Sequence, residues 1–415
     1  MMMEKNSPGN PDQASHPAKG KDILPRFSAS EYKRRYDLVR EEMDRRGLRA
    51  LILFGDSGHI GGFQTNCHYL SNYIDQFYSY VVFPYKGEPT LFFCLQPHET
   101  GVPPFSVIED IRWGGWDIAA AVAGRIRELG HDRERIGLVG VSSFQIKFTL
   151  PSDHLETLRK ELPHADLEVA TDILEDIRLV KSEEEIDAIR KGAAFGDAAV
   201  RALEKDVNAG MRERDLEAIV VSTVIKEGGI PHVQMFGSTS MVKPDLFCPR
   251  PHPSNRILEN GDIIFTEISA SYNRYSGQIV RPIVLGEPTR RYQELFDLAA
   301  AVHDGIAEVL RPGRSEQDVI HALQPIRKAG LIIQCSGLHG WGQTLERPTI
   351  GLPGVGRWKE GGIAPFSFRA NMTMMIEPNP VTPDKKMGMF VGNLHLVTKD
   401  DAINLQKHPL KLIVV

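Results

Sequence analysis

The chain has 415 residues, with 49 Lys and Arg against 54 Asp and Glu, and a formal net charge of -5. A hydrophobic fraction of 41% is ordinary for a globular protein and excludes a wholly disordered chain. The balanced charge argues against a nucleic-acid binder, because no basic excess is present to neutralise phosphates. No apolar run approaches the roughly 18 residues of a membrane span. We therefore expect a cytoplasmic protein with no membrane or nucleic-acid partner.

The first half of the chain alternates between helix-like and strand-like segments. Residues 1–26 are polar, contain Pro and Gly, and predict a disordered lead-in. Helical apolar spacing predicts a helix over 29–46, and short buried strands and helices then alternate. This alternation predicts an α/β domain over 27–170. No glycine-rich phosphate-binding motif opens any of its helices, so nucleotide binding is not indicated.

The second half, residues 171–415, contains an internal repeat. Residues 208–229 resemble residues 311–330, and both copies carry the pattern G-x-x-E-x-D. Each copy follows a long helix, starts a second helix and precedes strand-like sequence. Ser182 and Glu185 predict a capping box at the head of the first long helix. Two copies of helix, helix and strands predict one pseudo-symmetric α+β domain, with a site where the two halves of the sheet meet.

Two glutamates and two histidines mark candidate chemistry in this second domain. Glu267 and Glu377 each lie in a strongly apolar run, where an ionised carboxylate is costly unless it is paired. Burial beside a polar partner is how carboxylates gain the raised pKa of acid/base catalysts. His252 and His339 lie in neighbouring polar clusters. A salt-bridged core explains one such glutamate easily, but it explains the four groups together less well.

The motifs around these residues resemble those of the pita-bread family (M24), which includes methionine aminopeptidases, prolidases, aminopeptidase P and creatinase. The segment GDIIFTEISASYNRYSGQIVRP resembles the family's metal-binding strand pair, GLHGWG its GHGIG, and MTMMIEPNP its M-x-x-x-I-E-P-G. NCHYLSNY resembles a motif of the creatinase-type N-terminal domain. The resemblance implies an α/β N-terminal domain followed by a pseudo-symmetric α+β pita-bread domain. It also implies a homodimer.

The resemblance also places the family's metal ligands, which hold two divalent ions and are two Asp, one His and two Glu. Position by position, they fall at Glu267, Gln278, His339, Glu377 and Gly392. One ligand is therefore a neutral amide and another has no side chain. This departure implies a metal-free type of member without a cofactor, resembling creatinase and ectoine hydrolase. Glu267, His339 and Glu377 could still hold a single divalent ion, with His395 as a substitute ligand.

These residues predict a metal-independent hydrolase that cleaves a C–N bond other than a peptide bond in a small amide, amidine or cyclic amidine. We assign Glu377 as the base and Glu267 to orient or attack the substrate. His252 is the expected proton shuttle, and His339 a hydrogen-bonding partner. Arg347 could clamp a substrate carboxylate with its forked donors. The full set of substrate-binding candidates is Arg347, Gln278, Arg250, His232, Trp341 and Glu346.

Two alternatives stay open. The first is a metal-dependent enzyme of the same fold, either an Xaa-Pro-type peptidase or a lyase that acts on a small zwitterion such as dimethylsulfoniopropionate. The second is a non-catalytic binding protein, against which the retention of four ionisable groups in apolar strands weighs. The metal content of the protein separates the first alternative from the leading prediction. A pocket open to small molecules argues against the second.

Overall fold

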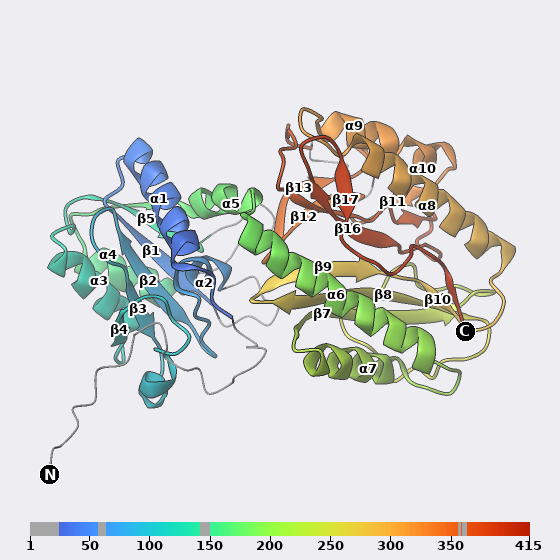
Figure 1. The fold of residues 1–415 in the computed structure, drawn as a ribbon, viewed down its shortest axis with the longest axis horizontal. Coiled ribbons are helices and arrows are strands. Elements are labelled where there is room, and N and C mark those ends of the chain that lie inside the picture. The colour runs from blue at the N-terminus through green and yellow to red at the C-terminus, as the bar shows by residue number, and fades with distance from the viewer. Residues whose placement is uncertain (1–24, 57–63, 142–149, 356–357, 359–362) are drawn as a thin grey trace, which may run out of the picture.

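The fold is known from a computed structural model that describes residues 25–56, 64–141, 150–355, 358 and 363–415. The predicted disordered lead-in lies outside the described residues as far as residue 24. The chain forms two lobes, one blue to teal and one green to red (Figure 1).

The N-terminal lobe has a mixed sheet in the order β4-β3-β2-β1-β5-β6, with helices packed on it. Its strands are β1 (Ala50–Gly55), β2 (Ser79–Pro84), β3 (Thr90–Phe93), β4 (Asp110–Trp113), β5 (Arg135–Val139) and β6 (Asp166–Val169). Its helices are α1 (Ala29–Arg46), α2 (Thr65–Ser71), α3 (Ile118–Glu128) and α4 (Ser152–Glu161). Helix α1 begins where the side chain of Ser28 accepts a hydrogen bond from the amide of Glu31. The predicted α/β fold of this half is confirmed.

Helix α5 (Thr171–Leu179) leads from this lobe into the second. Ile173 and Leu174 of α5 are buried in the same hydrophobic core as Val39 and Met43 of α1. A domain boundary at residue 170 stays a prediction.

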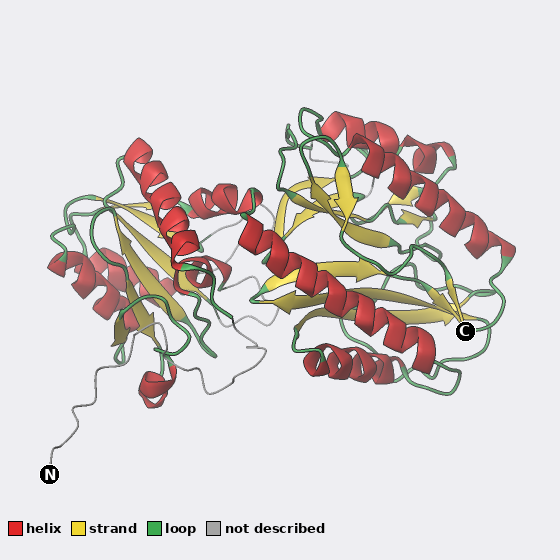
Figure 2. Cartoon of the chain, in the orientation of Figure 1, coloured by secondary structure: helices red, strands yellow, loops and turns green. Residues whose placement is uncertain are grey.

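The C-terminal lobe has a second sheet in the order β13-β12-β14-β16-β9-β8-β10-β18, with β7 paired to β8 and β17 to β16, and a separate pair of β11 with β15. Its helices lie around the outside of these strands (Figure 2). The helices are α6 (Glu183–Asp206), α7 (Glu213–Lys226), α8 (Arg290–Val309), α9 (Glu316–Ala322) and α10 (Gln324–Lys328). The strands are β7 (Ile230–Ser240), β8 (Asp262–Tyr272), β9 (Tyr275–Val280), β10 (Ile283–Val284), β11 (Ile332–Ile333), β12 (Leu338–Trp341), β13 (Leu345–Ile350), β14 (Thr373–Ile376), β15 (Pro380–Val381), β16 (Gly392–Val397), β17 (Ala402–Asn404) and β18 (Ile413–Val414).

The sequence repeat has the same structural role in both halves of this lobe. In the first copy the carboxylate of Asp215 accepts a hydrogen bond from the Arg212 amide at 2.8 Å, at the start of α7. In the second copy Asp318 accepts one from the Ser315 amide at 2.8 Å, at the start of α9. Each motif therefore starts the shorter helix of a pair, α6 with α7 and α8 with α9. The predicted pseudo-symmetric α+β domain is confirmed.

Helix α6 lies in backbone contact with the β8–β9 hairpin. A Cβ atom at Gly277 would lie 2.2 Å from the backbone nitrogen of Ala193, and one at Gly192 would lie 2.7 Å from the carbonyl oxygen of Ala270. Only glycine fits such an approach. The capping box predicted for Ser182 at the start of α6 is present. The position of the hairpin, which carries two of the candidate site residues, is therefore set by this helix.

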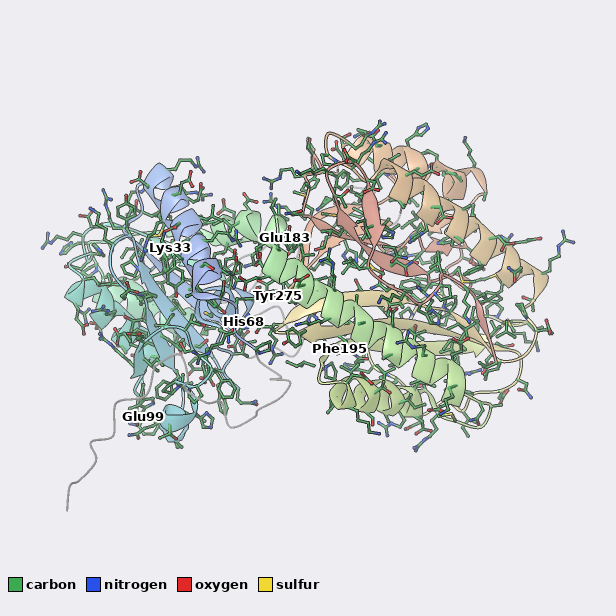
Figure 3. All side chains as sticks on the ribbon, viewed as in Figure 1. Lys33, His68, Glu99, Glu183, Phe195 and Tyr275 are labelled. Atoms are coloured by element: carbon green, nitrogen blue, oxygen red, sulfur yellow. The ribbon has the colours of Figure 1, made fainter. Side chains whose placement is uncertain are left out.

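Buried charges join the two lobes. Arg35 of α1 is fully buried and donates to Glu31 at 2.7 Å and to Glu185 of α6 at 3.1 Å. The hydroxyl of Tyr275, at the start of β9, donates to the same Glu185 oxygen at 2.5 Å. Tyr275 is labelled in Figure 3, where the lobes meet. The turn between β8 and β9 consequently lies at the junction of the two lobes.

Candidate active site

The middle of the second sheet brings together four of the candidate residues. Glu267 lies on β8, Gln278 on β9 and His339 on β12, and Glu377 follows β14 directly. The order β12-β14-β16-β9-β8 places these strands side by side. The cluster therefore lies where the two halves of the domain meet.

The four side chains contact one another in two pairs. The Nε2 atom of His339 lies 3.3 Å from Oε1 of Glu377. The Nδ1 atom of His339 lies 3.0 Å from the carbonyl oxygen of Gly340, so it carries the ring proton and leaves Nε2 facing the carboxylate. The amide of Gln278 donates to Oε1 of Glu267 at 2.8 Å. One pair thus contributes a carboxylate and an imidazole, and the other a carboxylate held by an amide.

Burial and mutual charge shift the pKa values of this cluster. Burial, followed by the charge of Glu377, raises the pKa of Glu267 to about 8. Burial opposes the charged form of His339, but the carboxylates of Glu377 and Glu267 outweigh it and raise the pKa of His339. Groups that titrate near neutral pH are suited to move protons in catalysis.

Two oxygen atoms of the cluster are left open. Oε2 of Glu377 and Oε1 of Gln278 are buried, and neither has a hydrogen-bond partner among the described residues. Buried polar atoms are almost always paired with protein, water or ligand, so two open acceptor atoms in one cluster are available to a bound molecule. The cluster is therefore the place where we expect a substrate.

His232 and Trp341 extend the cluster toward the N-terminal lobe. The ring of His232 stacks on Trp341 with centroids 5.5 Å apart, and Trp341 meets His339 edge to face at 5.6 Å. The Nδ1 atom of His232 lies 2.6 Å from the hydroxyl of Ser276. Burial, followed by the charge of Arg274, lowers the pKa of His232 to about 4. His232, one of the substrate-binding candidates from the sequence, is therefore an uncharged side chain that lines the site.

The loop that was expected to supply the proton shuttle points elsewhere. Arg250 donates to Oε1 of Glu213 at 2.7 Å, and Ser254 donates to Oε2 of the same residue. These bonds hold the loop against α7 and leave His252 exposed. The assignment of His252 as proton shuttle does not fit this structure. Cys248 of the same loop lies close enough to Glu267 to feel its charge. Burial, followed by this charge, raises the pKa of the Cys248 thiol to about 11.

Two further candidates have partners of their own. Glu346 is buried and forms an ion pair with Lys181, which also donates to the Leu179 carbonyl at 3.2 Å. Arg347 forms an ion pair with Asp176 at the edge of a cavity between the lobes. Both side chains therefore pair with other residues of the chain, and the structure places neither in the cluster.

His395, considered from the sequence as a substitute metal ligand, lies on the opposite face of the sheet from Glu377. His395 of β16 packs its ring 5.2 Å from that of His303 on α8. Met374, opposite His395 in the strand pair, and Met375, opposite Leu394, alternate between the two faces of the sheet. Because His395 lies on the helix side, it cannot join Glu377 on the other side.

Sequence reasoning missed His68 and Gln343. His68 lies on α2 of the N-terminal lobe, and its Nδ1 atom is 2.7 Å from the amide nitrogen of Gln343, which follows β12. Both residues are buried. A single histidine in a short helix carries no signal by itself, although NCHYLSNY was recognised as a motif of this lobe.

Comparison with known proteins identifies the family. Residues 187–399 match the model of metallopeptidase family M24, and residues 35–180 match the creatinase/prolidase N-terminal domain. The first match covers more than half of the chain. The chain belongs to metallopeptidase family M24. The same two-lobed arrangement is found in solved M24-like structures.

Relatives and solved structures similar to this chain include peptidases. An Xaa-Pro dipeptidase of Pyrococcus horikoshii is 26% identical over 281 residues, covering 66% of this chain and 76% of that protein. An uncharacterized hydrolase/peptidase of Sinorhizobium fredii is 26% identical over 96% of this chain and 99% of its own length. The X-Pro aminopeptidase of Thermotoga maritima has a TM-score of 0.76 at 18% identity, over 92% of this chain and 99% of its own. The dipeptidase PepE of Mycobacterium ulcerans has a TM-score of 0.75 at 24% identity, over 94% and 100%.

These relatives correct two expectations. The predicted hydrolase of non-peptide C–N bonds is wrong, because the relatives are named dipeptidases and act on peptide bonds. The expectation of no cofactor is also wrong, because M24 is a metallopeptidase family. The relatives are Xaa-Pro dipeptidases rather than creatinase or ectoine hydrolase, and they favour the metal-dependent peptidase alternative.

The residues of this M24 protein do not fit a two-ion centre. A Cβ atom at position 392 would lie 2.5 Å from Cε of Met375 and 2.6 Å from the carbonyl oxygen of Ile376. No carboxylate side chain has room there. At position 278 the amide donates to Glu267 and brings no negative charge. Two of the five ligand positions, 278 and 392, therefore lack a carboxylate. At position 392 neighbouring atoms also fill the space that its side chain would need.

The remaining donors suit one divalent ion by type. Glu267, His339 and Glu377 converge, and three protein ligands with an open position are usual in catalytic zinc sites. The orphaned Oε2 of Glu377 is a free ligand atom of this kind. In their present positions, no three His, Cys, Asp or Glu side chains of the described ranges form a metal-holding group. A single ion, held by these three residues, is the most that this donor set supports.

None of the helices in the described part of the chain is long and apolar enough to cross a membrane. The cytoplasmic location and the homodimer stay predictions.

Proposed function

We propose that this M24 protein hydrolyses the peptide bond of short peptides, with Xaa-Pro dipeptides as the first class to test. The observation that carries the proposal is the convergence of Glu267, His339 and Glu377 in one buried cluster with open acceptor atoms. The names of the relatives, which are dipeptidases of the Xaa-Pro type, supply the bond and the substrate class.

The side chains divide the work of hydrolysis. Oε2 of Glu377 is a free acceptor and takes a proton from the attacking water. Glu377 then passes that proton to the leaving nitrogen as the C–N bond breaks, and His339, with Nε2 3.3 Å from this carboxylate, holds it in position. Gln278 fixes Glu267 through its hydrogen bond, so that Glu267 orients the substrate. A divalent ion held by Glu267, His339 and Glu377, when bound, supplies Lewis-acid polarisation of the scissile carbonyl.

The test is the release of proline from Ala-Pro and Met-Pro by the purified protein, with Pro-Ala and Ala-Ala as controls for bond specificity. Each peptide is offered with Mn²⁺, Co²⁺ or Zn²⁺ and with a chelator. We expect the protein to cleave Ala-Pro and Met-Pro faster than the control peptides. The Glu377→Gln variant should lose this activity. Cleavage of none of these peptides under any of these conditions would contradict the proposal and favour a binding role.

A further inference from the structure

A second group of polar side chains lies at the junction of the lobes, one aromatic residue away from the acid/base cluster. His68 comes from α2, Arg274 from the β8–β9 turn, Gln343 from the turn after β12, and His232 from β7. Figure 3 labels His68 beside Tyr275, the residue that follows Arg274. Four separate elements of the fold therefore direct polar groups toward one place.

Arg274 has no counter-charge among the residues that the structure describes. It makes no ion pair and no hydrogen bond with another residue in the described part of the chain, and its Nε atom is buried without a partner. Burial lowers the pKa of Arg274, and no carboxylate offsets this effect. Arg274 is half-buried, and a guanidinium largely removed from water without a partner is costly, so such a group indicates an anion that binds there.

The backbone at Arg274 is also unusual for its residue type. Asn273 and Arg274 form the two-residue turn between β8 and β9, with φ values of 47° and 64°. A turn with positive φ at both positions favours Asn followed by Gly. An arginine at the position where glycine fits best has a local conformational cost, and strain of this kind collects at functional sites. The turn therefore accommodates the Arg274 side chain at a conformational cost.

His68 adds a directed hydrogen-bond donor. The side-chain nitrogen of Gln343 can only donate, so Nδ1 of His68 accepts and the ring proton lies on Nε2. That Nε2 atom is buried and makes no hydrogen bond of normal geometry with a described residue, although the side chain of Asn273 lies close enough to act on the pKa of His68. The charge of Arg274 acts on both His68 and His232, which places the three groups near one another. Arg274, Asn273 and His68 thus bring to one place a cation and polar atoms that are unpaired within the described residues.

From these contacts we infer that Arg274 and His68 form a subsite for a carboxylate of the peptide substrate. This inference rests on the proposed function and specifies it further. Because Trp341 lies between His232 of this group and His339, the carboxylate is separated from the scissile bond. It is either the terminal carboxylate of a peptide longer than two residues or an acidic side chain. Arg347, which is paired with Asp176, is not the arginine that binds it.

Binding to the Glu377→Gln variant tests the subsite without turnover. Calorimetry compares Ala-Pro-Gly with its C-terminal amide, and Glu-Pro-amide with Gln-Pro-amide. We expect at least a ~10-fold preference for the charged member in one of the two pairs, the size of effect that one charged hydrogen bond supplies. A preference in the first pair indicates a terminal carboxylate, and a preference in the second pair indicates an acidic side chain.

Arginine variants made in the same background locate the effect. Arg274→Met should abolish the preference and Arg274→Lys should retain part of it, while thermal melts verify the fold. Arg290→Met is the control, because Arg290 is exposed and paired with Glu294. A preference that survives Arg274→Met, or that is lost in Arg347→Met instead, overturns the inference. Equal binding, or no binding, of both members in both pairs also overturns it.

The outcomes separate the subsite from the proposed function. If the wild-type protein cleaves no peptide but the Glu377→Gln variant prefers the carboxylate through Arg274, the subsite stands and the peptidase proposal fails. If peptides are cleaved without any charge preference, the subsite fails and the peptidase proposal stands.

Discussion

The side-chain amide of Gln278 donates a hydrogen bond to Oε1 of Glu267 at 2.8 Å. The resemblance to the metal-dependent members places a carboxylate ligand at position 278. In this chain a neutral donor holds Glu267 from that position, and the negative charge that a second cation needs is gone. The contact therefore sets the metal capacity of the site.

We expect this protein, after loading with Mn²⁺ or Co²⁺ and dialysis, to hold no more than one ion per chain. The reason is that position 278 supplies no charge and position 392 has no room for a side chain. Elemental analysis measures the ratio. A chelator should remove the ion and stop peptide cleavage, while the thermal melt stays cooperative. Two tightly held ions per chain would contradict this expectation.

Replacing Glu377 by Gln should lower the rate by about 10²–10⁴-fold, the usual contribution of a general base. The change keeps the shape of the side chain, including its contact with the Ser336 hydroxyl at 3.2 Å. The melting temperature should therefore change little. Single-turnover rates and thermal melts on the same preparation check both parts.

The contrary result is equally clear for Glu377. A variant that melts early but turns over normally for each folded molecule would show a structural carboxylate. It would remove Glu377 from the proposed mechanism.

Glu346 offers a matched buried glutamate with a different expected behaviour. Its ion pair with Lys181 is buried on both sides, so Glu346→Gln leaves an unpaired ammonium inside the protein. We expect a loss of about 3 kcal/mol in the free energy of unfolding. Urea denaturation measures the loss, and Glu294→Gln, which breaks an exposed pair, should cause no measurable change. An unaltered midpoint for Glu346→Gln would refute the structural role of this pair.

Two histidines at the lobe junction, His68 and His232, make stability depend on pH, and buried His395, whose pKa is also lowered to about 3, adds to the effect. Burial, with the charge of Arg274, lowers the pKa of His68 to about 3 and that of His232 to about 4. The unfolded chain, with pKa values near 6.5, binds protons that the folded chain does not. The free energy of unfolding should therefore fall as the pH is lowered from about 6.5 toward 4, by up to ~1.4 kcal/mol per pH unit for each histidine.

The measurement is a series of urea denaturations between pH 7 and pH 4.5. The double variant His68→Asn and His232→Asn should show a flatter dependence, whatever its stability at pH 7. A slope equal to that of the wild-type protein would mean that these histidines are protonated in the folded state.

Local elements followed from the sequence because their signals are local. The helix over 29–46 and the capping box of Ser182 depend on neighbours three or four residues apart. The G-x-x-E-x-D repeat, in the same way, depends on Asp215 and Asp318 bonding to a backbone amide three residues before each of them. These features keep their form wherever the rest of the chain lies.

The sequence by itself determined the family fold and the buried cluster of Glu267, His339 and Glu377, because apolar strands restrict which polar residues they tolerate. Only the tertiary structure decided which polar groups are left without partners. Arg347 and Glu346 pair with residues of α5 and the segment before α6. Arg274, at the lobe junction, has no partner within the described ranges. Pairing depends on distances between elements far apart in the chain, and a one-dimensional pattern does not contain those distances.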